Sequence, residues 1–395
     1  MKRSTDRILT THPGRLPNPD NYAEVMQARR GGDERRFNEA TRAGIQDMIH
    51  RQNELGIDIK SDGEFWKVRD QRWFDERCTG VLVRPRKPDE HGFNQLSARR
   101  EGRMPEFREF YAIYDQLGNT PTPGGRPNPP ADMYQVIVGP IQVTSGEAVR
   151  LEVQRTKDTI VAAGERVEDY IFPVIAPGWL GTAVHDEYYH DRDKFNYGLA
   201  ELLKNDYHAV VDAGFTLQID DPAFLTRNTV YEHEMSREDY RKDCEARIEA
   251  TNWALEGIPQ DRVLYHTCWG SFHTPHTTDL PFDWVIDLLR QLNVGAYSVE
   301  AADVRHELDV ELFESFKLPE GRSYYPGVIA HKTTTVEPPE LVAHRLVQYA
   351  KLLGRENIVA STDCGLGGRC YPEIAWAKLR SLVEGARLAS KQLWH

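Results

Sequence analysis

A histidine and a cysteine two residues apart are the first residues in this sequence that could bind one metal ion together. The segment YHTCWG places His266 and Cys268 at the end of an apolar run. In an extended strand, residues i and i+2 point to the same face, so both side chains can reach one ion. Such a pair at a strand end is more often part of the packing than of a metal site. The pair by itself does not decide between these two interpretations.

Two more residues of metal-binding types follow other predicted strands. Glu300 comes directly after AYSV, and Cys364 follows NIVAST in the segment TDCGLGGR. The active sites of (β/α)8 barrels assemble at the C-terminal ends of the strands, where both residues lie. With His266 and Cys268 they form a plausible tetrahedral zinc set dominated by soft thiolates. Cys370 is a rival to Cys364, but it lies beyond a glycine-rich turn.

The charges of this set indicate the chemistry that it could support. Two thiolates and one carboxylate outweigh the charge of a zinc ion, so the site is a poor Lewis acid for a carbonyl. It is better suited to hold a substrate thiol as a thiolate at neutral pH, which predicts S-alkylation. Glu300 is then the ligand that the substrate displaces. The alternative is a structural zinc site, although such sites favour CxxC pairs and closed shells.

Two further strand ends carry groups suited to proton transfer. The segment LQIDDPAF places Asp220 where a carboxylate could bind a substrate ammonium or transfer a proton, whereas Asp221 is better interpreted as a loop cap. GVIAHKTTT places His331 at another strand end. An imidazole that titrates near neutrality could protonate the leaving group of an alkyl transfer. A structural histidine is the alternative.

The ends of the first two strands supply candidates for substrate binding. ILTTHPGRLP places His12 and Arg15 after the first strand, and KSDGEFW places Glu64 after the second. The guanidinium of Arg15 is a natural partner for a carboxylate or a sulfonate. The alternative is that Arg15 is an ordinary surface arginine without a role in binding.

Short apolar runs alternate with segments of helical periodicity, which is the pattern of βα units. The predicted strands are Ile8–Thr11, Ile57–Ser61, Gln135–Gly139, Ile171–Ala176, Phe215–Ile219, Arg262–His266, Ala296–Val299, Val328–Ala330 and Ile358–Ser361. The predicted helices include Asp191–Asp212, Arg237–Leu255, Phe282–Leu292 and Pro338–Leu353. The nine predicted strands are one more than a barrel needs. Gln135–Gly139 is the one that we expect to lie outside the barrel. The sequence therefore predicts an α/β fold of the (β/α)8 TIM-barrel type.

A long stretch rich in Arg, Pro and Gly follows the second predicted strand. This stretch, Val81–Ala131, contains TPTPGGRPNPP and predicts an irregular insertion. Insertions of this kind are usually functional loops or lids, and a surface excursion is the alternative. No internal repeat and no linker divides the chain, so we expect residues 1–395 to form a single catalytic domain.

The composition restricts the classes of partner. The net charge of −12 and a pI near 5.7 disfavour nucleic acid and anionic membranes. The sequence has no apolar run long enough to span a bilayer and no secretory signal, and its 5 cysteines do not form a disulfide framework. We therefore expect a cytoplasmic enzyme acting on small molecules, with homo-oligomerisation left open.

These motifs resemble those of the cobalamin-independent methionine synthase family, in particular its C-terminal catalytic barrel and single-barrel relatives such as the epoxyalkane:coenzyme M transferases. The resemblance extends from TTHPGRLP to TDCGLGGR. It implies a (β/α)8 barrel that binds Zn2+ through the following residues: His266, Cys268, Glu300 and Cys364. It also implies that Asp220 and Glu64 contact the substrate and that His331 donates a proton.

The sequence departs from the methionine synthases at several positions. The chain has no room for their second, N-terminal barrel, which helps to bind folate. Arg15 stands where methionine synthases have a serine that holds the carboxylate of the amino acid. LQIDDP has Asp221 in place of Glu, and Thr226 stands where the family has a folate-contacting glutamate. These changes leave the expected zinc–thiolate chemistry intact and put both homocysteine and methyl-folate in doubt.

Several functions remain open from the sequence. The leading one is zinc-dependent methyl transfer to homocysteine or a related small thiol from a methyl donor. The alternative is addition of a sulfonated or carboxylated thiol to an epoxide or another alkyl donor, which Arg15 favours. A metal-free decarboxylase or lyase and a non-catalytic binding protein are more distant, because neither requires two cysteines and a carboxylate at separate strand ends.

Overall fold

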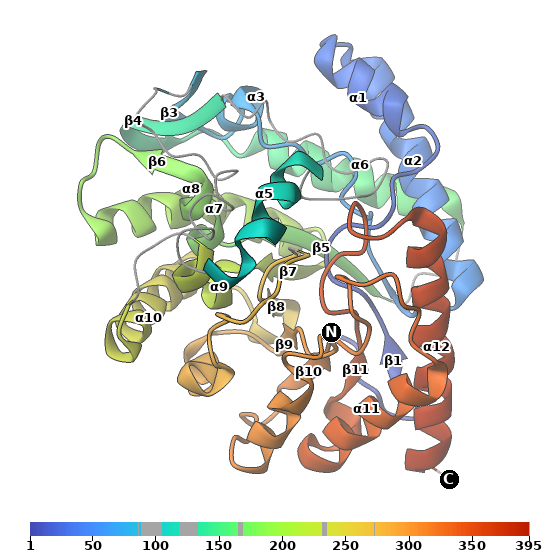
Figure 1. Cartoon of the computed structure of the whole chain (residues 1–395). Helices are drawn as coiled ribbons and strands as arrows, with labels where there is room; N and C mark the ends of the chain where they lie inside the picture. The colour runs from blue at the N-terminus through green and yellow to red at the C-terminus, as the bar shows by residue number, and fades with distance from the viewer. Residues whose placement is uncertain are drawn as a thin grey trace.

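A computed structural model describes residues 1–85, 87, 105–117, 133–164, 169–230, 235–271 and 273–394. Its central feature is a curled sheet of parallel strands surrounded by helices (Figure 1). The parallel strands are β1 (Leu9–Thr10), β2 (Ile59–Lys60), β5 (Asp169–Ile175), β7 (Thr216–Asp220), β8 (Val263–Thr267), β9 (Ala296–Val299), β10 (Ser323–Pro326) and β11 (Val359–Ala360). These residues are almost all buried, as expected for a parallel sheet covered by helices.

The hydrogen-bonded order of the strands follows the chain around the sheet. Six strands pair in the order β10-β9-β8-β7-β5-β2, and β1 pairs with β11. Parallel bridges, Tyr324 to Ile358 and Gly327 to Ser361, connect β10 to β11. The blue β1 therefore lies beside the red β11 in Figure 1, which brings the two ends of the chain together. Between β1 and β2, the Thr11 hydroxyl donates a hydrogen bond to the Ile59 carbonyl at 3.0 Å.

A small apolar cluster fills the space inside the curled sheet. It contains one residue from each of seven strands, namely Leu9, Ile59, Ile171, Leu264, Ala296, Tyr325 and Val359. The larger core lies between the strands and the helices, and includes fully buried side chains such as Leu203 and Leu346. Layers of inward-pointing side chains are typical of barrel interiors.

The helices pack around the outside of the strands (Figure 1). The α-helices are α1 (Tyr22–Arg30), α2 (Glu34–Leu55), α3 (Gln71–Asp75), α5 (Arg108–Leu117), α6 (Glu147–Ala163), α7 (Pro177–Ala183), α8 (Arg192–Asp212), α9 (Ala223–Val230), α10 (Arg237–Ala254), α11 (Pro339–Leu353) and α12 (Pro372–Trp394). The 3-10 helices are η2 (Pro105–Phe107), η3 (Gln260–Arg262), η4 (Phe282–Trp284), η5 (Ile286–Gln291), η6 (Glu307–Glu314) and η7 (Arg355–Asn357). Side-chain caps begin several of them: Asp33 caps α2, Asp191 caps α8 and Ser236 caps α10.

The structure differs from the predicted elements at two places in the second half of the chain. The strand beside β9 is SYYP, Ser323–Pro326, and the apolar run Val328–Ala330 forms the loop after it. Both tyrosines of SYYP are buried, and the strand was missed because the stronger apolar run, Val328–Ala330, directly follows it. The segment predicted as the helix Phe282–Leu292 consists of two 3-10 helices, because its amides bond to carbonyls three residues back, as in Val285 to Phe282.

The segment after β2 is more regular than predicted. Strand β3 (Cys78–Pro85) pairs antiparallel with β4 (Met133–Val143), and β4 pairs parallel with β6 (Val184–Asp186) in a separate three-stranded sheet. The expendable strand Gln135–Gly139 indeed lies outside the main sheet, within β4. Within the predicted irregular stretch Val81–Ala131, the described residues form the end of β3, η2 and α5. Apart from Lys87, which pairs with Glu187, the rest of that stretch lies outside the described residues.

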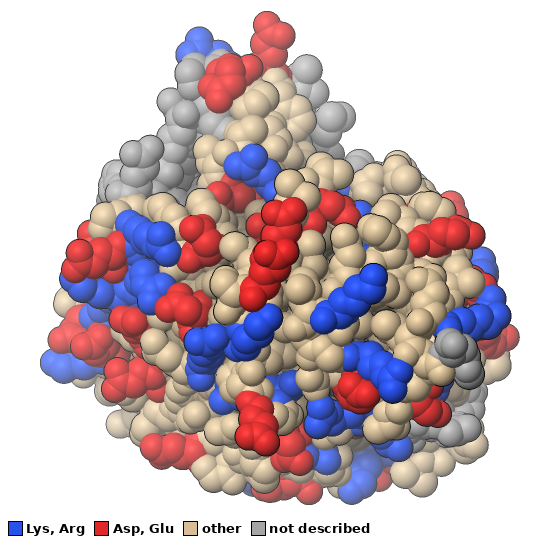
Figure 2. All heavy atoms as spheres, turned by 90° about the horizontal axis from the view of Figure 1, so that it is seen from below, with Lys and Arg blue, Asp and Glu red and all other residues tan. Residues whose placement is uncertain are grey.

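Charges of both signs alternate over the face shown in Figure 2. On this side of the molecule the acidic excess of the sequence does not gather into one acidic field. Among the helices that the structure describes, none combines the length and the apolar character needed to cross a bilayer.

Candidate metal and substrate site

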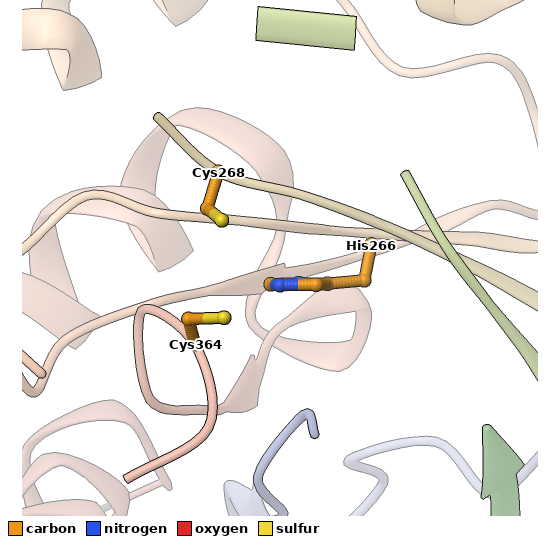
Figure 3. A group of neighbouring side chains, drawn as sticks. All are labelled: His266, Cys268 and Cys364. Carbon is orange, nitrogen blue, oxygen red and sulfur yellow. The ribbon is translucent and has the colours of Figure 1, made fainter. Parts of the chain in front are cut away.

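Three of the predicted zinc ligands meet at one end of the curled sheet. His266 lies in β8, Cys268 follows that strand, and Cys364 lies in the loop after β11. Their ligand atoms all lie within 4.8 Å of one another, and Figure 3 shows the side chains pointing toward a common point. Strand alternation places His266 and Cys268 on one face, as the sequence predicted.

The loop that carries Cys364 packs against the segment that follows β1. The amide of Gly367 donates a hydrogen bond to the carbonyl of Arg15 at 2.7 Å. A β-carbon on Gly365 would lie 3.0 Å from the same carbonyl oxygen and 3.1 Å from the carbonyl carbon of Gly14. Glycine is therefore needed at position 365 for the loop to approach β1 and present Cys364 to β8.

The imidazole of His266 is oriented as a metal ligand requires. Its Nδ1 atom lies 3.1 Å from the Ser298 hydroxyl on β9, which fixes the ring. Its Nε2 atom is buried and has no conventional hydrogen-bond partner within the described part of the chain. A ring nitrogen held by an outer partner while the other nitrogen faces the centre is the usual arrangement of a metal-bound histidine.

The protonation of the two thiols is coupled. A hydrogen bond from the Cys268 thiol lowers the pKa of Cys364 well below its usual value, against the effect of burial and with support from His266. The same hydrogen bond, together with burial, raises the pKa of Cys268. Burial disfavours the charged form of His266, but the Cys364 thiolate outweighs that effect and raises the pKa of His266. Of the two thiols, Cys364 is therefore the one disposed to ionise, and zinc favours thiolate ligands.

The carboxylate of Glu300 lies outside this group of three. Its Oε2 atom accepts a hydrogen bond from the backbone N–H of Trp269 at 2.8 Å, and its Oε1 atom lies 2.6 Å from Nζ of Lys332. Glu300 forms a second group of possible ligands with His331 and Asp363. The four predicted zinc ligands are therefore neighbours, but the structure brings three of them together and directs the fourth to a lysine.

Sequence reasoning missed Lys332. Its side chain is 5% exposed, and its ammonium also contacts Asp303 at 3.1 Å. Burial acts against the charge, but the neighbouring carboxylates of Glu300 and Asp303 raise the pKa of Lys332. The available signal was its position directly after His331, at the strand end already identified.

The imidazole of His331 is fully buried and uncharged. Burial lowers the pKa of His331 well below the usual value. Neither ring nitrogen has a hydrogen-bond partner among the residues described by the structure. A neutral imidazole with two unused nitrogens can take up one proton and release it again.

Two acidic residues predicted to bind substrate influence each other at the same end of the sheet. Burial raises the pKa of Asp220 to about 7, and the charge of Glu64 contributes. The Asp220 carboxylate accepts a hydrogen bond from the Gln218 amide at 2.9 Å. Glu64 adopts a left-handed backbone conformation with φ 57°, which is uncommon for a residue other than glycine. Such local strain is often found at functional sites.

The other predicted contacts have partners within the protein. His12 lies 3.0 Å from Gln52, and burial lowers the pKa of His12. Arg15 is 6% exposed, and its guanidinium donates a hydrogen bond to Asn18 at 2.5 Å. Arg15 is therefore a buried residue, although the sequence equally allowed a surface position. Asp221 accepts hydrogen bonds from the Tyr265 hydroxyl at 2.8 Å and from the backbone N–H groups of Ala223 and Phe224, as a loop cap does.

Comparison with known proteins decides the family. The model of the catalytic domain of the cobalamin-independent synthases matches residues 182–388, which include every residue of the metal-ligand group. The chain belongs to this family. It is thus a member of a family of methionine synthase-like transferases, as its motifs predicted.

Several relatives illustrate this membership. The chain is 22% identical to a methionine synthase of Sulfolobus acidocaldarius over 98% of this chain and 93% of that protein. It is 25% identical to a methionine synthase of Sulfurisphaera tokodaii over 57% of this chain, and the match spans 58% of the relative. A 2-hydroxypropyl-CoM lyase of Xanthobacter autotrophicus is 25% identical over 37% of this chain and 45% of that protein.

A solved structure shares the fold. The B12-independent methionine synthase of Shewanella sp. W3-18-1, in complex with selenomethionine, matches with a TM-score of 0.69 and 18% identity. The match covers 98% of this chain and 99% of that one. The curled parallel sheet of this family member is therefore an architecture that a B12-independent methionine synthase also has.

Proposed function

We propose that this family member is a zinc-dependent transferase that alkylates a small thiol on sulfur. In its simplest form it transfers a methyl group to homocysteine or a related thiol. The observation that carries the proposal is the group of His266, Cys268 and Cys364, whose ligand atoms lie within 4.8 Å of one another and of which the first two are buried. A histidine nitrogen and two sulfurs are the ligand types that zinc prefers.

The residues present fit a zinc ion. The imidazole of His266 contacts the Cys364 sulfur, and the thiols of Cys268 and Cys364 point to the same region. Glu300 follows the neighbouring strand and would be a fourth ligand only if its carboxylate left Lys332. When bound, zinc holds the substrate sulfur as a thiolate at neutral pH and keeps it nucleophilic.

The protein side chains would bind the substrate and move its proton. Glu64 and Asp220 form an acidic pair that suits an ammonium group. His331 stays neutral because burial lowers its pKa, so its imidazole passes the proton of the thiol on to the leaving group and does not store it. As the new S–C bond forms and the bond from carbon to the leaving group breaks, His331 returns the proton to the leaving nitrogen or oxygen.

We further propose that the curled sheet closes into a (β/α)8 barrel and that residues 1–395 form one catalytic domain. The interior cluster supports closure, because it includes Leu9 of β1 and Ile59 of β2, the two strands at the ends of the hydrogen-bonded order. The Thr11 side chain bridges the same two strands.

A second candidate function differs in its substrates. Arg15 suits a sulfonate or carboxylate, and the chain resembles a 2-hydroxypropyl-CoM lyase over part of its length. In this case a sulfonated or carboxylated thiol reacts with an epoxide or another alkyl donor, and His331 protonates the new alkoxide.

The test combines metal analysis with a panel of substrates. The purified full chain should contain about one zinc ion per molecule. Homocysteine and 2-mercaptoethanesulfonate are each incubated with methyl-folate, a methylated corrinoid and an epoxide, and S-alkylated products are identified by mass spectrometry. Methylated homocysteine supports the first function, and alkylated 2-mercaptoethanesulfonate supports the second. A metal-free protein that decarboxylates its substrate and tolerates Cys364→Ala would contradict both.

A further inference from the structure

The buried ion pair between Glu300 and Lys332 joins the metal-ligand group to a residue without an assigned role. Nζ of Lys332 lies 2.6 Å from Oε1 of Glu300 and 3.1 Å from Oδ2 of Asp303. The side chains are 5% exposed for Lys332 and fully buried for Glu300. A buried ion pair of this kind is hard to break, because either charge left alone would be desolvated without compensation.

A second contact holds the other oxygen of Glu300. The backbone N–H of Trp269 donates to Oε2 at 2.8 Å. The indole of Trp269 stacks on His306 at 3.5 Å between ring centres, and its Nε1–H donates to the carbonyl of Leu280 at 2.8 Å. One oxygen of Glu300 therefore pairs with Lys332 and the other accepts from the backbone of Trp269, and neither of these partners belongs to the group of His266, Cys268 and Cys364.

The charges favour this arrangement when a thiol must bind. Zinc with two thiolates and one histidine is neutral, whereas addition of the Glu300 carboxylate makes the centre negative. A negative centre repels the thiolate that the proposed reaction requires. Lys332 neutralises Glu300 in place and so removes that repulsion, which leaves one zinc position for the substrate.

We propose that Lys332 is a positioning residue that holds Glu300 away from the zinc centre formed by His266, Cys268 and Cys364 and thereby keeps one metal position available to the substrate thiol. The inference rests on the proposed function, since it requires zinc at these three residues. It adds that zinc and Lys332 compete for the carboxylate of Glu300, and that this competition determines whether Glu300 becomes the fourth ligand.

The test is a double-mutant cycle on zinc affinity. Zinc-loaded full-length protein is titrated with a chelator for the wild type, Lys332→Met, Glu300→Gln and the double variant. With Lys332 present, Glu300→Gln should change the zinc dissociation constant less than about threefold, because Glu300 is held off the metal. Lys332→Met should tighten zinc binding about tenfold or more by freeing the carboxylate, and the double variant should lose that gain.

Thiol binding gives a second readout. In the cobalt-substituted protein, titration with homocysteine or 2-mercaptoethanesulfonate is followed by the sulfur-to-cobalt charge-transfer band. Lys332→Met should weaken thiol binding about tenfold, because Glu300 then occupies the available position. Lys332→Arg keeps the charge and should restore most of the wild-type behaviour.

Controls separate this inference from misfolding and from the proposed function. Lys204→Met removes a lysine of α8 that pairs with Glu256 in the turn after α10, and it should leave zinc and thiol affinities unchanged. Circular dichroism checks the fold of each variant, and Lys332→Gln replaces Lys332→Met if the latter fails to fold. If Glu300→Gln weakens zinc binding equally with and without Lys332, the inference is wrong while the proposed function stands. If the wild type binds no zinc, both are wrong.

Discussion

Cys364 and Cys370 lie in the same segment of the chain, but only the surroundings of Cys364 suit a metal ligand. Cys364 faces His266 and Cys268, and hydrogen bonding from the Cys268 thiol keeps the pKa of Cys364 low. Cys370 lies near the carbonyl of His331, with the sulfur 3.5 Å from that oxygen, and burial raises the pKa of Cys370. The thiolate is the form that binds metals, so we assign the ligand role to Cys364.

The two cysteines therefore make a matched pair of variants. Cys364→Ser should lower zinc affinity at least tenfold and reduce thiol alkylation about a hundredfold or more, because a thiolate ligand is lost. Cys370→Ser should retain both properties within about threefold. Zinc content after dialysis and the rate of S-alkylation measure the difference, and loss of zinc in Cys370→Ser alone would reverse the assignment.

A second prediction concerns Asp220. Burial raises its pKa to about 7, and an ammonium group is bound by the ionised carboxylate. For an amino thiol such as homocysteine, kcat/KM should therefore rise as the pH increases through about 7. Asp220→Asn should remove this inflection and lower kcat/KM at pH 8, and 2-mercaptoethanesulfonate, which has no ammonium, should not respond. A pH profile unchanged by Asp220→Asn would exclude Asp220 from this role.

The loops after neighbouring strands fix one another through buried polar contacts. His306, at the start of η6, lies 3.1 Å from Asp279 and 3.0 Å from Asp309, while Asp279 also lies 2.7 Å from His276. This network connects the loop after β8 to the segment after β9. Because the same loops carry Trp269 and Glu300, the network positions the groups around the metal-ligand site.

The stability of this network should depend on pH. Burial acts against the charge of His306, but hydrogen bonds to Asp279 and Asp309 outweigh it and raise the pKa of His306 from 6.5 to about 9. The stabilisation is complete below pH 6.5 and is lost as the pH rises through 9. The free energy of unfolding should decrease by about 3 kcal/mol over this interval. His306→Gln should abolish the decrease in urea titrations, and an unchanged slope in this variant would contradict the assignment.

The glycine turn after β11 allows a prediction about how loop position controls zinc affinity. Gly365→Ala adds a β-carbon against the backbone of Arg15 and Gly14, so the loop must move and carry Cys364 with it. Zinc affinity should fall about tenfold or more, with little change in circular dichroism. Gly31→Ala, at the end of α1, meets an atom no nearer than 3.4 Å and is the control. Unchanged zinc affinity in Gly365→Ala would show that the loop has room to adjust.

The ends of the chain meet in the sheet, so the metal-ligand group connects distant parts of the sequence. β1 pairs with β11, and the loop after β11 supplies Cys364, while β8 supplies His266. A ligand that binds the folded state alone stabilises it by an amount that grows with ligand concentration. We therefore expect zinc to stabilise the whole molecule.

Thermal unfolding tests this expectation. Zinc at a free concentration of about 100 times its dissociation constant should add about 2.7 kcal/mol to the free energy of unfolding. The midpoint of unfolding should increase accordingly in the wild type and increase clearly less in Cys364→Ser, because the weaker site is less fully occupied at the same zinc concentration. An equal increase in both proteins would indicate that zinc binds elsewhere.

The sequence alone determined the types of the candidate ligands and the end of the sheet where they lie. Residues at i and i+2 of a strand share a face, and parallel strands end at one edge, so His266, Cys268 and Cys364 could be grouped from spacing and strand order. Local apolar patterns also located most of the strands. SYYP was missed because the stronger apolar signal, Val328–Ala330, lies in the loop that follows.

The partner of Glu300 depended on tertiary packing. Glu300 and Lys332 lie after different strands, and each has several charged neighbours in the sequence. Their 2.6 Å contact arises because the adjacent strands β9 and β10 bring the two loops together in a buried space. Spacing along the chain predicts which residues share an edge of the sheet. Which charged groups then pair depends on the distances and the burial that the packed loops create.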